Sequence, residues 1–213
     1  MPTIIEDALA FDFPPDWQVT KYDQQADDSA DELAGFDRRI TQSAGVKHVR
    51  GMDIVCRLPG NLPSLQLIEV KDDRLRAADV LPAPCRWPAG DCQQRLSNST
   101  LRHTQLYETV LLKTVGALAG LLLAERLGEN TLRATACLTQ NPAIEVILFL
   151  AERPVEAEPT SVRAKLRRSA GLDRTEVLHQ KLTAKLHQWG LPFKLYNLTN
   201  RPPALWQVRD LNE

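Results

Sequence analysis

The sequence predicts an α/β domain in which a β-hairpin is followed by a helix, a strand, a second helix and a final strand. Two observations lead to this prediction. Strand patterns flank a proline-rich turn within 46–70, and the segments after it alternate between helical and strand patterns. Such alternation is typical of α/β domains, in which helices cover a central sheet. Ahead of the hairpin, the acidic segment 27–32 is compatible with either a loop or a helix near residue 30.

The hairpin is predicted from residue types and turn signals. Val, Ile and Met, punctuated by glycine, indicate one bent strand or two short ones over 46–58. The segment Pro-Gly-Asn-Leu-Pro at 59–63 has the composition of a tight reversal, and strand formers resume at 65–70. We therefore expect these two segments to pair.

An insertion and a long helix are expected next. Residues 76–100 contain several prolines and show no sustained helical or strand period, which predicts a surface insertion. Apolar side chains then recur at helical spacing over 101–127, and Gly128 is placed to end this helix. Its most apolar part, 110–124, is shorter than the roughly 20 residues needed to cross a bilayer. We therefore expect a buried helix and no membrane span.

The last third of the chain predicts two strands and a helix between them. The segment 144–151 is almost continuously apolar and β-branched, which indicates a strand covered on both faces in a mixed or parallel sheet. A basic, proline-bounded link follows. A capping box at Asp173 and Glu176 then predicts a helix that ends just before Gly190. The segment 193–198 has the pattern of a final strand.

Composition limits the class of protein. The 213 residues are 43% apolar and 25% charged, which is ordinary for globular proteins, and we expect a single domain over 1–213. The formal net charge of −1 argues against coating nucleic acid by bulk electrostatics, so any DNA contact should be local. The four cysteines form no CxxC pair and the N-terminus does not have the pattern of a secretory signal. These features favour a reduced, cytoplasmic protein.

Three charged residues occur on the predicted hairpin strands. Residues two apart in a strand point to the same face, so Glu69 and Lys71 project together while Ile68 and Val70 face the other way. Asp53 lies on the preceding strand, and the turn between the strands can bring it beside Glu69. A slip of one residue in the hairpin register would turn Asp53 away. In the expected register, two carboxylates and one lysine meet.

These groups suit a metal site for phosphodiester chemistry. Burying unpaired charge is expensive, and two adjacent carboxylates repel each other. A hard cation such as Mg²⁺, bound through oxygens and retained waters, would remove that repulsion. Such an ion polarises a phosphodiester and lowers the pKa of a bound water, and Lys71 could orient that water or stabilise the phosphorane oxygens. The residues therefore favour phosphodiester hydrolysis.

The pattern of Asp53 on one strand and Glu69-Val70-Lys71 on the next resembles the motif of the PD-(D/E)xK nuclease superfamily. The expected elements over roughly 30–200 also resemble its restriction-endonuclease-like αβββαβ core, a mixed central sheet flanked by helices. The resemblance implies that Asp53 and Glu69 ligate Mg²⁺ or Mn²⁺ with help from the Val70 carbonyl, and that Lys71 assists the attacking water. Met52 stands where the motif has proline, a position that the superfamily holds loosely.

The resemblance implies further site residues. The superfamily often adds an acidic residue from its first helix, for which Glu32 or Asp31 is the candidate and Asp23 a rival. Some members use a Gln and a Tyr from the helix after the Lys strand. Gln105 and Tyr107 lie there, although not at the usual Gln-x-x-x-Tyr spacing.

A basic cluster downstream is a candidate for local contacts with DNA phosphates, although such runs are more often only solvated. Its members are Arg163, Lys165, Arg167, Arg168 and Arg174. Two active sites would be needed to cut both strands of a duplex, so a homodimer or partner subunits would suit double-strand cleavage by analogy.

Three functional hypotheses remain open. The first is a Mg²⁺-dependent nuclease, acting as an endonuclease or exonuclease on the phosphodiester bonds of DNA. The second is a catalytically inactive interaction module with the same fold, in which the charged residues form a structural network. The third is an RNA-cleaving nuclease with the same metal site. The first and second differ in metal dependence, whereas the first and third differ only in substrate.

Overall fold

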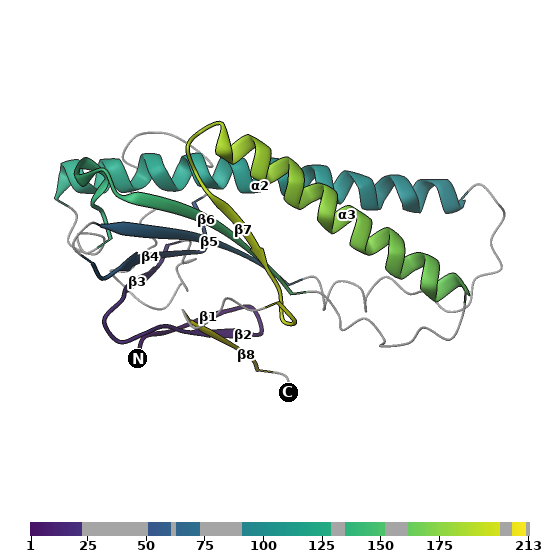
Figure 1. The fold of residues 1–213 in the computed structure, drawn as a ribbon, viewed down its shortest axis with the longest axis horizontal. Helices are drawn as coiled ribbons and strands as arrows, with labels where there is room; N and C mark the ends of the chain where they lie inside the picture. Colours follow the sequence, from purple (N-terminus) through teal and green to yellow (C-terminus); the bar gives the residue numbers. More distant parts are fainter. Residues whose placement is uncertain are drawn as a thin grey trace, which may run out of the picture.

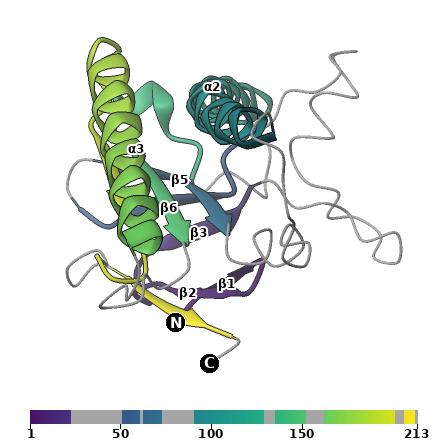
Figure 2. The ribbon, with the colours of Figure 1, turned by 90° about the vertical axis from the view of Figure 1, so that its right-hand side faces the viewer.

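The computed structural model describes residues 1–22, 51–60, 63–72, 91–128, 135–151, 162–200 and 206–211, with the backbone alone described at 91–104 and 162–174. In these ranges the fold is α/β and has three layers (Figures 1 and 2). Two helices lie over one face of a five-stranded sheet, and a three-stranded sheet covers its other face. The predicted α/β class is confirmed. The small sheet is a layer that the residue patterns do not predict.

The five-stranded sheet is mixed and has the strand order β3-β4-β5-β6-β7. Its strands are β3 (Gln18–Lys21), β4 (Ile54–Leu58), β5 (Ser64–Asp72), β6 (Ala143–Ala151) and β7 (Phe193–Tyr196). β3, β4 and β5 pair antiparallel, whereas β6 and β7 continue parallel to β5. The predicted hairpin is β4 with β5, and the strand predicted to be covered on both faces is β6. The expected strand formers at 46–50 lie outside the described residues.

Helix α2 (Asp91–Leu127) begins earlier than the sequence predicts. The expected surface insertion at 76–100 is therefore wrong for its last ten residues, 91–100, and its remainder lies outside the described residues. The segment between Asp91 and Leu101 contains no proline or glycine, so cooperative propagation extends the helix through it at little cost. At 1.5 Å per residue α2 is about 55 Å long, and its first half extends beyond the sheet (Figure 1). This placement explains why no apolar period marks 91–100. Gly128 ends the helix as predicted, with a φ of 66° that suits glycine.

Helix α3 (Val162–His187) also begins earlier than predicted. Asp173 and Glu176 lie inside the helix, so the predicted capping box is wrong, and the expected basic link is helical from Val162 onward. Leu, Ala, Lys and Arg dominate this segment, and their helix propensity outweighs the cost of about 1 kcal/mol for Gly171. The end is as predicted, because Gly190 has a φ of 72° and donates its N–H to the His187 carbonyl at 2.9 Å.

The hydrophobic core has one layer on each face of the five-stranded sheet. The layer between this sheet and the helices contains, among others, Val55, Leu65, Leu67, Leu148, Leu121 and Leu182. The layer between the two sheets contains, among others, Ile54, Ile68, Val70, Phe149, Phe11 and Trp206. Alternate residues of β4 and β5 therefore enter different layers, as the two-residue period of a strand requires.

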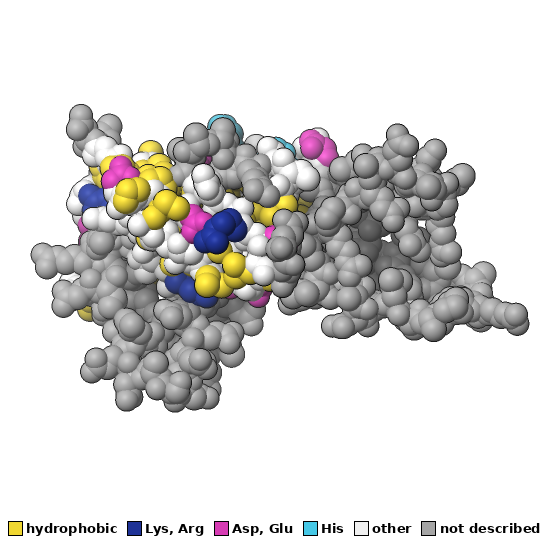
Figure 3. Space-filling model, turned by 90° about the horizontal axis from the view of Figure 1, so that it is seen from below, with side chains coloured by type: hydrophobic (Ala, Val, Ile, Leu, Met, Phe, Trp, Pro, Cys, Tyr) yellow, Lys and Arg dark blue, Asp and Glu magenta, His cyan; other side chains and the backbone are white. Residues whose placement is uncertain are grey.

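The three-stranded sheet joins two distant parts of the chain. β2 (Leu9–Asp12) pairs antiparallel with both β1 (Thr3–Glu6) and β8 (Gln207–Asp210). Trp206 holds this sheet to the larger one, because its ring centroid lies 5.6 Å from Phe11 and 6.1 Å from Phe149. Viewed from this side, the surface that the structure describes carries small, separate areas of hydrophobic, basic and acidic side chains (Figure 3).

One segment of α2, Gln105–Leu127, is long and apolar enough to cross a membrane by length and composition alone. It is longer than the stretch 110–124, from whose length a buried helix is predicted. Core helices of soluble proteins meet the same criterion. Here Val110, Ala117 and Leu121 are buried against the sheet, so packing accounts for the apolar character of this face.

Candidate functional site

Asp53 stands immediately before β4, at the point where this strand begins to pair with β5. The hairpin register places Ile54 opposite Ile68, and its continuation places Asp53 opposite Glu69. The predicted register is therefore confirmed. Two contacts fix Asp53: its carbonyl accepts a 2.9 Å hydrogen bond from the Tyr22 N–H, and its Oδ2 accepts a 2.6 Å bond from the Val70 N–H.

Glu69 and Lys71 project from β5 toward the helices, on the face opposite Val70. The Glu69 side chain is completely buried, whereas that of Lys71 is 32% exposed. Their charged groups pair on the same face of this strand, with 2.6 Å between Lys71 Nζ and Glu69 Oε1. The structure thus brings Asp53, Glu69 and Lys71 together, as the sequence predicts, with Lys71 at the solvent side.

A fourth charged residue, Lys113 of α2, completes the group and is not among the site residues predicted from the sequence. Lys113 Nζ lies 2.7 Å from Asp53 Oδ1 and 2.9 Å from Glu69 Oε2, so it bridges the two carboxylates. Its side chain is only 6% exposed. A lysine inside the most apolar stretch of a helix was the available signal, because a buried charge requires a partner. We call Asp53, Glu69, Lys71 and Lys113 the charged cluster.

Burial and charge act in opposite directions on the acid and the base of this cluster. Burial, together with the nearby charge of Asp53, raises the pKa of Glu69 to about 7, although Lys113 and Lys71 oppose the shift. Burial alone would lower the pKa of Lys113, but the carboxylates of Glu69 and Asp53 outweigh it and raise that pKa. Lys113 is therefore firmly cationic, whereas Glu69 is held in its ionised form only weakly.

The oxygens of the cluster suit a hard divalent cation. Glu69 offers two buried oxygens that lie near ammonium groups but accept no hydrogen bond of regular geometry within the described part of the chain. The N–H and C=O of one strand residue point to the same edge, so the Val70 carbonyl faces the side on which Asp53 lies. Two carboxylates, a carbonyl and waters suit Mg²⁺ or Mn²⁺. Among the described residues, no group of three or more His, Cys, Asp or Glu side chains forms a metal site.

The other predicted site residues are not brought to the cluster by any described contact. Gln105 is exposed on α2, about two turns before Lys113, and Tyr107 packs against the helix-side core. The acidic candidates Glu32, Asp31 and Asp23 lie outside the described residues. The side chains of the basic residues are likewise outside the described part, although their backbone belongs to the first half of α3; they are Arg163, Lys165, Arg167, Arg168 and Arg174.

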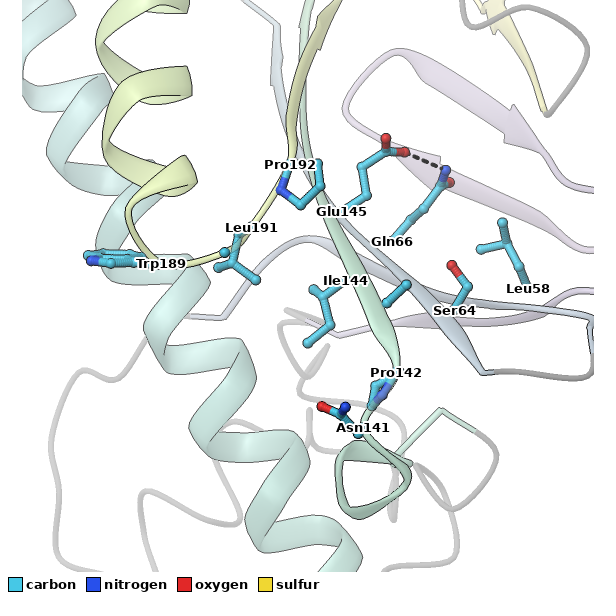
Figure 4. Close-up of a pocket in the computed structure, with 12 residues that line it drawn as sticks. Leu58, Ser64, Gln66, Asn141, Pro142, Ile144, Glu145, Trp189, Leu191 and Pro192 are labelled. Atoms are coloured by element: carbon cyan, nitrogen blue, oxygen red, sulfur yellow. Dashed lines mark hydrogen bonds between the residues drawn. The ribbon is translucent and has the colours of Figure 1, made fainter.

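A separate hollow of about 610 Å³ lies at the opposite end of the sheet, where β5 and β6 begin (Figure 4). Two of its polar lining side chains, Gln66 and Glu145, already have partners. Gln66 donates a 2.9 Å hydrogen bond to Glu145, whose other oxygen pairs with Lys194 at 2.7 Å. The Trp206 indole donates to Gln66 at 3.3 Å. The buried Gln66 and its neighbour Glu145 are therefore already paired, so we place the candidate site at the charged cluster.

Comparison of the chain with models of protein families, with curated proteins and with solved structures found no match. The function is therefore inferred from the residues of this chain. The charged cluster provides the strongest basis, because it combines two carboxylates with a partly exposed lysine at one end of the central sheet.

Proposed function

We propose that this protein is a metal-dependent nuclease that hydrolyses phosphodiester bonds of DNA. One observation carries the proposal: Asp53 and Glu69 direct carboxylate oxygens to a common point, and Lys71 pairs with the other oxygen of Glu69. Asp53, Glu69 and the Val70 carbonyl would hold Mg²⁺ or Mn²⁺. A divalent ion bound there supplies positive charge that polarises a phosphodiester and makes water a stronger nucleophile.

The protein groups around this point have distinct tasks. The Val70 N–H holds one oxygen of Asp53, which leaves the other oxygen directed into the cluster. The partly exposed ammonium of Lys71 is the cationic group nearest to solvent, so it can donate hydrogen bonds to an arriving phosphate or orient the attacking water. The burial of Glu69 excludes competing water from its carboxylate.

The order of elements supports the same proposal. Three antiparallel strands, β3, β4 and β5, are followed by α2 and then by β6 parallel to β5. This order resembles the βββαβ part of the restriction-endonuclease-like core, with Glu69 and Lys71 on β5 and Asp53 directly before β4. The basic residues in the first half of α3, Arg163, Arg167 and Arg168 among them, are proposed contacts for DNA phosphates.

The test is cleavage by the purified chain in Mg²⁺, Mn²⁺ or EDTA. Wild-type protein should cut DNA with either metal and lose activity in EDTA. Asp53→Ala and Lys71→Ala should abolish cleavage while circular dichroism shows a folded protein, whereas Lys181→Ala, an exposed lysine on α3, should keep it. Retained activity in the first two variants would reject the proposal. Linear duplex, circular duplex, single-stranded DNA and RNA substrates separate exonuclease from endonuclease action and DNA from RNA cleavage.

A second candidate, an inactive interaction module, is favoured by the position of Lys113. Two carboxylates and two ammonium groups balance each other, so the cluster is neutral without a divalent ion. In such a module the cluster would only join α2 to the sheet. Calorimetry should then detect no Mg²⁺ or Mn²⁺ binding, and Asp53→Ala should reduce stability without affecting any reaction. Saturable Mn²⁺ binding that Asp53→Ala abolishes would exclude the module.

A further inference from the structure

Lys113 occupies the point on which the proposed metal ligands converge. Asp53 Oδ2 is engaged by the Val70 N–H, so Oδ1 is the oxygen directed into the cluster, and that oxygen lies 2.7 Å from Lys113 Nζ. The nearer oxygen of Glu69 lies 2.9 Å from the same nitrogen. A divalent ion coordinated by these two oxygens must therefore displace the Lys113 ammonium group.

The electrostatics of the cluster make this competition direct. Asp53 and Glu69 repel each other, and either an ammonium group or a metal ion can relieve the repulsion. Both cannot occupy one point, because a cation at Lys113 Nζ would repel a divalent ion held by the same oxygens. Lys113 has a flexible four-carbon stem, so its ammonium can move while its α2 backbone stays in place. The partly exposed Lys71, which pairs with the other oxygen of Glu69, marks the side on which the cluster opens to solvent.

We propose that Lys113 is an internal counter-ion that competes with the divalent cation, so that metal binding displaces its ammonium from Asp53 and Glu69. This inference rests on the proposed metal-dependent function. Lys113 keeps the two carboxylates together before metal arrives and lowers the affinity of the site for metal. It is a positioning residue, and its effect on metal affinity can be measured without a DNA-cleavage assay.

The test is Mn²⁺ calorimetry on wild-type protein and two variants. Lys113→Met keeps most of the side-chain length and removes the charge, so it should bind Mn²⁺ at least about tenfold more tightly, since close charge pairs commonly couple by more than this factor. Lys113→Arg keeps the charge and should show no such gain. Mn²⁺ should also raise the Tm of Lys113→Met more than that of wild-type protein, because it replaces the lost cation.

The outcomes separate this inference from the proposed function. Mn²⁺ binding to wild type with equal or weaker binding to Lys113→Met overturns the role of Lys113 and leaves the metal site standing. Binding to Lys113→Met alone supports competition but rejects metal dependence in the wild-type protein. Absence of binding in both proteins overturns both ideas.

A second measurement on wild-type protein covers the case in which Lys113→Met does not fold. Lys113 is 5% exposed and should be acetylated slowly in EDTA, whereas exposed Lys181 should react quickly. Saturating Mn²⁺ should increase the labelling of Lys113, as read by peptide mass spectrometry, and leave Lys181 unchanged. Labelling of Lys113 that does not change with saturating Mn²⁺ would overturn displacement.

Discussion

The backbone N–H of Val70 donates a 2.6 Å hydrogen bond to the side chain of Asp53, seventeen positions earlier in the chain. This bond forms just beyond the end of the β4–β5 ladder. There the Asp53 carboxylate, and not a backbone carbonyl of β4, accepts the hydrogen bond from β5. It orients the Asp53 carboxylate so that its other oxygen faces Lys113. One side chain thus closes the hairpin and supplies an acidic group to the cluster.

Asp53→Ala should therefore destabilise the fold by about 3 kcal/mol, because it breaks a buried ion pair and leaves the Val70 N–H without its acceptor. Asp53→Asn keeps an oxygen for Val70 and should recover about 1 kcal/mol of that loss. Urea unfolding of the three proteins measures both changes. Equal stability of the Ala and Asn variants would show that the Val70 bond does not contribute.

Glu69 should make stability depend on pH. Burial and the charge of Asp53 raise its folded-state pKa from 4.5 to about 7, so ionisation is less favourable in the folded than in the unfolded chain. The stability linked to protonated Glu69 is complete below its unfolded pKa and is lost as pH rises through the folded value. Urea unfolding should show a loss of up to about 3 kcal/mol between about pH 5 and about pH 8.

Glu69→Gln provides the control for this pH dependence. It removes the titrating group and leaves every other ionisable residue, so the difference between wild type and variant isolates Glu69. The variant should lose most of the decline in stability over the same interval. An identical decline in both proteins would assign the pH dependence to other groups.

Gly51→Ala should disturb the charged cluster indirectly, through Tyr22. A Cβ at this position would overlap the ring of Tyr22, which is 2% exposed and whose N–H binds the Asp53 carbonyl. We expect overpacking to lower the free energy of unfolding by about 2 kcal/mol and to weaken Mn²⁺ binding.

Gly128→Ala is the matched control, because its Cβ would meet nothing within 4 Å and only its positive φ causes strain. Urea unfolding should show a smaller loss of about 1 kcal/mol for Gly128→Ala and calorimetry should show unchanged Mn²⁺ binding. A Gly51 variant no worse than this control would contradict the prediction.

Trp206→Ala should destabilise the whole domain, although Trp206 belongs to the segment that leads into the small sheet. Its side chain is 3% exposed and packs between the two sheets, so truncation should cost about 3–5 kcal/mol. Thermal unfolding followed by circular dichroism and by fluorescence should show one shared transition at a lower Tm. Arg209→Ala, which removes the ion pair between the exposed Arg209 and the buried Asp12, should lower the Tm less than Trp206→Ala does. Separate transitions for the two probes in Trp206→Ala would mean that the small sheet is an independent unit.

The local features of this protein could be predicted from its residue patterns. Side chains alternate along a strand, so the spacing of Glu69 and Lys71 was enough to place both on one face. Turn residues located the hairpin, and Gly128 and Gly190 marked the ends of both helices because glycine adopts a positive φ without strain. The starts of the helices were not predictable in this way, since propagation through polar residues leaves no apolar period.

The contacts between side chains of different layers became visible only in the folded protein. Lys113 is one charge in an apolar stretch, and only the packing of α2 on β5 shows that it bridges Asp53 and Glu69. The small sheet has the same origin, because β2 pairs with β8 almost two hundred positions away. Each of its strands has four residues, too few to show a clear period. Local patterns follow from backbone geometry, whereas these contacts depend on the burial of surfaces that the chain brings together only on folding.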